Sequence, residues 1–166
     1  MSFNKTVKLV EDSEIFKDFI RNHENAELCV GFFVLDFIKS INQMSVDYKI
    51  GKKVFTFSVN DLGEVSLKED ELIENPKFPP LTKIKSKVKI DLEEAESIAR
   101  GKAFDESVAQ KFEKIIAIVQ NYEDNQVWNL TCMLASFVIL NIIIDADDAK
   151  IVKFDKKTMG DFIRKA

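Results

Sequence analysis

One histidine and two cysteines are the residues of this sequence best suited to nucleophilic or metal chemistry. His23 follows a run of helical periodicity, and a cationic side chain near the carboxyl end of a helix is ordinary. A catalytic triad or a zinc site would need this histidine beside a cysteine and carboxylates from unrelated segments. Cys29 and Cys132 lie within apolar strand patterns, which favours small buried side chains over a disulfide or a ligand pair. We therefore expect no catalytic residue, no metal site and no cofactor.

Two groups of carboxylates could bind a cation. Asp145, Asp147 and Asp148 resemble the beginning of a calcium-binding loop, but the twelfth position is Lys156 and no glycine stands sixth. This pattern is typical of a solvated turn. The second group comprises Asp61, Glu64, Glu69, Asp70, Glu71 and Glu74. It could hold a cation or meet a basic partner, although such clusters are usually hydrated surface. The sequence has no glycine-rich phosphate loop, so nothing in it indicates nucleotide hydrolysis.

Lysines recur at nearly every second position between Lys77 and Lys89. Such a run could contact an acidic surface or nucleic acid, but lysines on an edge strand more often prevent aggregation between sheets. The chain has a net charge of -4 and few arginines, which argues against a nucleic-acid scaffold.

Three aromatic side chains that carry polar atoms, Tyr48, Tyr122 and Trp128, could line a pocket between a helix and a sheet. The more general interpretation is that they fill the core and place their polar atoms at its rim. Together with Asp145, which ends an apolar run, they are our candidate pocket or interaction residues.

The stretch from Val127 to Val152 predicts the core of a sheet. Its first part alternates with a period of two and places Trp128, Leu130, Cys132 and Leu134 on one face of a strand. Residues 137–144 are apolar on both faces and rich in β-branched side chains, as in a central strand covered on both sides. Only Ala135 and Ser136 separate the two runs, which indicates an antiparallel hairpin.

The remaining elements follow from shorter patterns. Asp12 or Ser13 caps a predicted helix that ends at His23, and Asp91 caps a second helix that ends at Gly101. Strands are predicted at 5–10, 28–38, 46–50, 55–59, 64–67, 112–120 and 150–154, and Thr158 precedes a last short helix. A linker with all three prolines spans 68–89 and should enter another strand at its end.

The two halves present these signals in the same order, which indicates a structural repeat. The paired segments are TVKLVEDSEIFKDFI with KVKIDLEEAESIA, CVGFFVLDF with KIIAIVQNY, SVDYKI with VWNLTC, and FTFSVNDLGEV with LNIIIDADDAKIV. Each half would then be a helix followed by an antiparallel meander, and two such small units should pack together or share one sheet.

The second half resembles a PepSY-type module. The resemblance lies in the helix DLEEAESIA, the strand VWNLTC with its tryptophan, and the terminal ILNIIIDADDAKIV with its Asp-Ala turn. It covers residues 83–155, and the first half only faintly. The family usually has glycine in that turn, where this chain has Asp148 and Ala149. The resemblance implies a fold more than an activity; PepSY modules are associated with binding or restraining peptidases.

The sequence thus predicts an α+β fold of two tandem units, each one helix plus an antiparallel β-meander of PepSY- or cystatin-like plan, and a short C-terminal helix. The first unit would span 1–75, a Pro- and Lys-rich linker 76–89, and the second unit 90–166. A non-enzymatic module that binds an unknown protein or peptide is the predicted function. The alternatives are a peptidase-restraining protein, or a small-ligand-binding protein or enzyme with a cavity between helix and sheet.

The first residues and the lengths of the apolar runs bear on the location of the protein, and the repeat bears on its assembly. The first residues, MSFNKTVKLVEDSE, are charged where a secretory signal is apolar, and no run reaches the roughly 18 apolar residues of a membrane span. We therefore expect a cytoplasmic protein with no membrane span and no nucleic-acid partner. The repeat would also allow a homodimer through a sheet edge.

Overall fold

The strands of the described residues join one sheet, and period-two apolar patterns are clearest in β5 and β6. The computed structural model describes residues 1–72 and 80–164. Within them, eight antiparallel strands lie in the order β4-β3-β2-β1-β5-β6-β7-β8. The strands are β1 (Glu27–Asp36), β2 (Gln43–Ile50), β3 (Lys53–Val59), β4 (Val65–Glu71), β5 (Phe112–Tyr122), β6 (Asn125–Leu134), β7 (Val138–Asp145) and β8 (Ile151–Lys157). The fold is α+β, as predicted.

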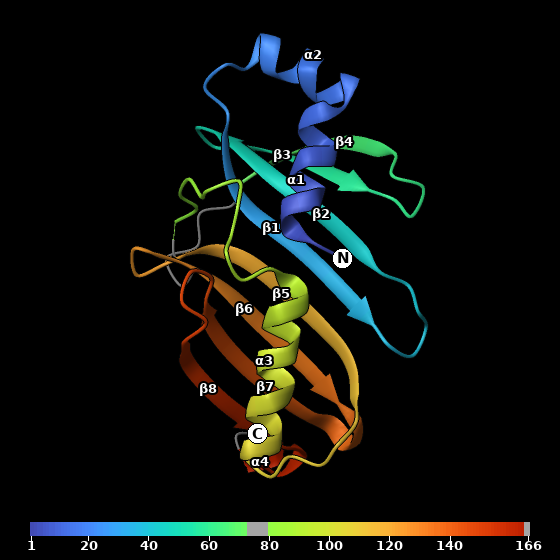
Figure 1. The fold of residues 1–166 in the computed structure, drawn as a ribbon, viewed down its shortest axis with the longest axis vertical. Helices are drawn as coiled ribbons and strands as arrows, with labels where there is room; N and C mark the ends of the chain where they lie inside the picture. The colour runs from blue at the N-terminus through green and yellow to red at the C-terminus, as the bar shows by residue number, and fades with distance from the viewer. Residues whose placement is uncertain (73–79, 165–166) are drawn as a thin grey trace.

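The helices of the described residues are α1 (Phe3–Asp12), α2 (Glu14–Asn22), α3 (Leu92–Asp105) and α4 (Met159–Arg164), with one 3-10 turn, η1 (Ala135–Phe137). Helices α1 and α3 lie across the same face of the sheet, α1 over the first four strands and α3 over the last four (Figure 1). Because apolar helix faces must be buried, the core fills the layer between these helices and the sheet.

Aromatic side chains fill the first half of this layer. Phe16 and Phe19 of α2 contact Tyr48, Phe55 and Phe57, with ring centroids 4.9–6.3 Å apart. At the junction of the halves, Phe3 contacts both Phe33 and Trp128 edge-on, at 6.4 and 6.3 Å. Trp128 is fully buried, in agreement with the period-two prediction for β6.

The carboxylate of Asp91 joins the two helices that cover the sheet. Its Oδ1 accepts hydrogen bonds from the backbone amides of Leu92, in α3, and Phe3, in α1, both at 2.7 Å. Its Oδ2 accepts from the Ser2 hydroxyl at 2.6 Å and the Asn4 amide at 3.2 Å. One side chain therefore satisfies free amides at the start of two helices that are far apart in sequence.

Residues 80–90, which we call the crossing segment, run between the halves without helix or strand. The Ile84 amide donates to the Leu28 carbonyl at 2.8 Å, and the Gln126 side chain bonds the Lys85 amide and carbonyl at 2.9 and 3.2 Å. The Trp128 indole donates to the Ile90 carbonyl at 2.7 Å. The segment is thus fixed to β1 and β6.

Several predicted elements differ from the structure. Residues 5–10 lie in helix α1 and not in a strand, because Phe3, Val7 and Val10 recur at helical spacing and face the core. The first half therefore has two helices, not one. Helix α3 continues past Gly101 to Asp105, since Ala103 still packs in the core.

The other differences concern connections. The crossing segment enters no strand before Asp91. The hairpin between β6 and β7 needs three residues, with Ser136 and Phe137 both at positive φ, and Phe137 is not part of the strand. Residues 73–79, which include Glu74, Lys77 and the predicted boundary between the first unit and the linker, lie outside the described residues.

Replacing Asp91 should cost more than replacing an ordinary helix cap. We expect Asp91→Ala to lower the free energy of unfolding by about 2–4 kcal/mol, because two helices lose a cap worth roughly 1–2 kcal/mol each. Ser13→Ala is the control, since the Ser13 hydroxyl accepts an amide at the start of one helix, from Phe16 of α2 at 3.2 Å, and donates to the Val10 carbonyl at 2.6 Å. Urea denaturation followed by Trp128 fluorescence measures both; equal losses would contradict a shared cap.

Alanine substitutions at two glycines should change the stability in opposite directions. A Cβ on Gly31 would lie 2.6 Å from Val119 Cγ1 and 2.7 Å from the Phe3 ring, so we expect Gly31→Ala to lower stability by about 1–3 kcal/mol. A Cβ on Gly101 would meet nothing within 4 Å, so Gly101→Ala should raise stability by about 0.5–1 kcal/mol. The same urea experiment checks both signs.

Candidate functional site

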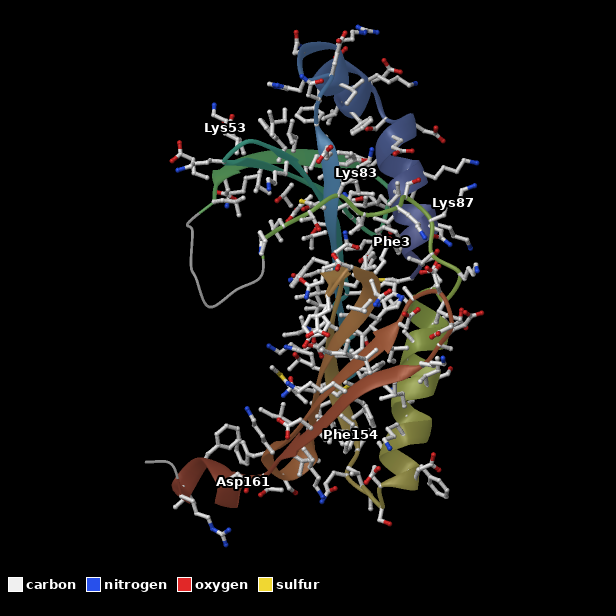
Figure 2. All side chains as sticks on the ribbon, turned by 90° about the vertical axis from the view of Figure 1, so that its left-hand side faces the viewer. Phe3, Lys53, Lys83, Lys87, Phe154 and Asp161 are labelled. Carbon is white, nitrogen blue, oxygen red and sulfur yellow. The ribbon has the colours of Figure 1, made fainter. Side chains whose placement is uncertain are left out.

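The face of the sheet opposite α1 and α3 carries the candidate site, and we call it the open face. Phe33 and Ala117 face the helices, so their strand neighbours point the other way. Phe32 lies opposite Ile118 and Val34 lies opposite Ile116, and all four are partly exposed. Apolar side chains therefore line the middle of a face that neither α1 nor α3 covers (Figure 2).

At one end of the open face, helix α4 and the β6–β7 hairpin border an open hollow of about 700 Å³. Its lining is almost entirely apolar: Glu113, Met133, Leu134, Ser136, Phe137, Val138, Ile139, Met159, Phe162 and Ile163. Phe137 and Ile163 are 70% and 69% exposed, although both are large hydrophobic residues. Figure 2 shows α4, labelled at Asp161, on the opposite side of the sheet from α3.

Local hydrogen bonds explain why α4 begins where it does. The Thr158 amide and hydroxyl donate to Asp161 Oδ2 at 2.8 and 3.0 Å. The Asp161 amide in turn donates to the Thr158 carbonyl at 3.0 Å. This reciprocal arrangement starts the helix at Met159. Met159, Phe162 and Ile163 then recur at helical spacing and line the hollow.

A second hollow, of about 690 Å³, lies at the polar part of the open face. Ser45, Ser58 and Ser66 are direct neighbours across β2, β3 and β4 and line it, together with Asn60 and Glu64. The open face thus carries a row of hydroxyl groups across β2, β3 and β4, whereas the hollow beside α4 is lined almost entirely by hydrocarbon.

Asp47, on β2, is a largely buried carboxyl group of the open face. Burial raises the pKa of Asp47, partly opposed by a hydrogen bond from Thr56, and the charge of Asp70 raises it further. Its Oδ1 is buried and has no hydrogen-bond partner within residues 1–72 and 80–164. The Cys29 thiol donates to the Asp47 carbonyl at 3.3 Å, and burial, followed by the Asp47 charge, raises the pKa of that thiol to about 12. This thiol is therefore not a nucleophile at neutral pH.

The structure separates the four candidate residues. Tyr48 and Trp128 are buried on the helix-facing side, where the Tyr48 hydroxyl donates to Glu11 Oε1 at 3.2 Å. Burial raises the pKa of Tyr48 well above its ordinary value. Tyr122 ends β5 and is partly exposed, while Asp145 Oδ1 accepts the amides of Asp147 and Asp148 at 2.8 and 3.0 Å in a tight turn. None of the four lines either hollow.

The remaining candidates from the sequence are His23 and the clusters of possible metal ligands. His23 packs against Phe19 and Phe55, with ring centroids 4.8 and 5.0 Å apart. Across residues 1–72 and 80–164, no three His, Cys, Asp or Glu side chains are placed to hold a metal ion. The sequence analysis did not predict the open face. The runs 28–38 and 137–144 could have indicated it, because they are apolar on both faces of a strand.

Comparisons with known proteins inform the fold alone. No protein-family model matches the chain, and no curated protein matches it. A similar solved structure is a crystal structure described as a "putative lipoprotein" from Clostridium difficile 630. It is 10% identical, has a TM-score of 0.59, and the match covers 87% of this chain and 91% of that one. None of the described helices is long and apolar enough to span a bilayer.

The buried carboxyl of Asp47 predicts a pH-dependent effect. An acid whose pKa is raised in the folded state favours folding below its unfolded pKa and loses that contribution as pH rises. We therefore expect Asp47→Asn to be more stable than the wild type near neutral pH, and this advantage to shrink toward about pH 3.5. Urea titrations at both pH values measure the difference; an advantage that does not change with pH would contradict it.

Proposed function

We propose that this protein is a binding protein that holds an apolar segment of a partner protein in the hollow between α4 and the open face. The observation that carries this proposal is the exposure of Phe137, Met159, Phe162 and Ile163 around one hollow. Exposed apolar side chains are normal when scattered, but a contiguous group indicates an interaction site.

The composition of the lining supports binding by side-chain burial. Hydrocarbon and thioether groups from both α4 and the sheet face the hollow, and methionines such as Met133 and Met159 adapt to different shapes. Among the described residues of the lining, Glu113 is the ionisable one. A partner segment with a basic residue beside apolar ones would place that charge near Glu113 while its apolar side chains fill the hollow.

A small apolar molecule is the second candidate occupant. The volume of about 700 Å³ lies within the range of pockets that bind small molecules. The hollow is bounded by one short helix and one hairpin, and this open construction favours a protein segment over an enclosed ligand.

We also propose that the two halves share one plan, because the sequence presents the same order of signals in both, and that the second half is a PepSY-like module. In each half, helical residues precede a four-stranded meander. The halves are joined at the middle of the sheet, where β1 pairs with β5. In a peptidase-restraining protein of this kind, the hollow would receive a segment of the peptidase. The cytoplasmic location inferred from the sequence stays a prediction.

The test compares two exposed phenylalanines. Phe162→Glu places a carboxylate in the hollow, whereas Phe104→Glu makes the same change on α3, where Phe104 is 83% exposed and outside the hollow. A library of short apolar and basic-apolar peptides is screened against the wild type, and the best binder is titrated against both variants. We expect Phe162→Glu to weaken binding by at least about tenfold, because a charge must be desolvated, and Phe104→Glu to have little effect.

Circular dichroism of both variants checks that they fold. Equal losses in the two variants, or no peptide bound by the wild type, would contradict the proposal. Binding of anilinonaphthalene sulfonate or a fatty acid that Phe162→Glu abolishes, without any peptide binding, would favour the small-molecule candidate.

A further inference from the structure

Six lysines gather on one side of the molecule, and we call them the basic surface. They are Lys5 and Lys8 of α1, and Lys83, Lys85, Lys87 and Lys89 of the crossing segment, all exposed. Within the crossing segment they alternate with Ile84 and Val88, which are buried in the core. The buried residues anchor the segment, so the lysines point outward. Figure 2 shows Lys83 and Lys87 on the segment as it passes β1 toward α1.

Hydrogen bonds fix α1 beside the crossing segment. The Asn4 side chain donates to the Val88 carbonyl at 3.0 Å and accepts the Val88 amide at 2.9 Å. This pair places Lys5 next to Lys87 and Lys89, so the basic surface combines two segments more than 80 residues apart. The two acidic residues of the first turn of α3, Glu93 and Glu94, bound it beyond Lys89.

The charges of the basic surface are largely uncompensated. Lys85 pairs with Asp147 at 3.4 Å, and both side chains are solvent-exposed, so the pair contributes little. Among the described residues, the other five lysines make no ion pair within 4 Å. The chain as a whole has a net charge of -4, so this positive region is a local segregation of charge.

We propose that the basic surface docks onto an anionic phospholipid bilayer. All six cations are lysines, which act as flexible point charges, whereas recognition of single phosphates or carboxylates in fixed geometry favours arginine. Clusters of four to eight basic residues are characteristic of binding to anionic lipids. Leu9, 45% exposed, adjoins Lys8 and adds a hydrocarbon group at the same surface. The described residues of the surface include no aromatic side chain on which nucleic-acid bases could stack.

The test is co-sedimentation of the full chain with vesicles of phosphatidylcholine alone or with about 30% phosphatidylserine. We expect binding only to the anionic vesicles, and its loss between about 0.1 and 0.5 M salt. The variant Lys5→Gln/Lys83→Gln/Lys87→Gln should bind about 100-fold more weakly, since each lysine contributes roughly fivefold.

The control Lys39→Gln/Lys111→Gln/Lys153→Gln changes the net charge equally with exposed lysines outside the basic surface, and should lose less than about threefold. Phe162→Glu should bind vesicles as the wild type does, which separates this surface from the hollow. Equal binding to both vesicle types, no binding to either, or equal losses in the two triple variants would overturn the proposal. Tighter binding to polyglutamate or duplex DNA than to anionic vesicles would overturn the choice of partner.

Discussion

The carboxylate of Asp91 is the interaction on which the arrangement of the helices depends. Backbone amides at the start of a helix need acceptors, and here one side chain serves both α1 and α3. Because the two helices share this acceptor, their amino-terminal ends meet over the junction between β1 and β5. Phe3, held there by its amide, packs onto Trp128 and leaves no room for a side chain at Gly31. Capping and core packing therefore depend on each other at this point.

Placing both covering helices on one face leaves the other face for binding. The strands at the centre of the sheet are apolar on both faces, so the open face keeps Phe32, Val34, Ile116 and Ile118 partly exposed. Helix α4 covers only the end of that face and leaves a hollow beside it (Figure 2). The same asymmetry that stabilises the core thus supplies the apolar surface for which we propose a binding role.

The crossing segment joins the two halves of the sheet and also exposes a row of lysines. Its backbone is hydrogen-bonded to β1 and β6, and Ile84 and Val88 are buried between the two halves, while its lysine side chains remain exposed. Alternation of lysine with apolar residues usually indicates a strand, but here Gln126 and Asn4 supply side-chain hydrogen bonds in place of a neighbouring strand. The result is an ordered basic surface on an acidic chain. It lies on α1 and the crossing segment, away from the hollow beside α4.

Local patterns in the sequence determined the α+β class, most strands and the cap Asp91, and they narrowed the other cap to Asp12 or Ser13, because periodicity and capping act over a few residues. The sequence also identified Trp128 as a residue suited to the core. Only the tertiary structure decided that residues 5–10 are helical, since a short alternating segment fits a strand until Phe3 and Val7 find a core to enter. The hollow was beyond local reasoning because it joins segments far apart in sequence. Of the basic surface, the sequence showed only the lysine run of the crossing segment, since the hydrogen bonds between Asn4 and Val88 bring Lys5 beside it.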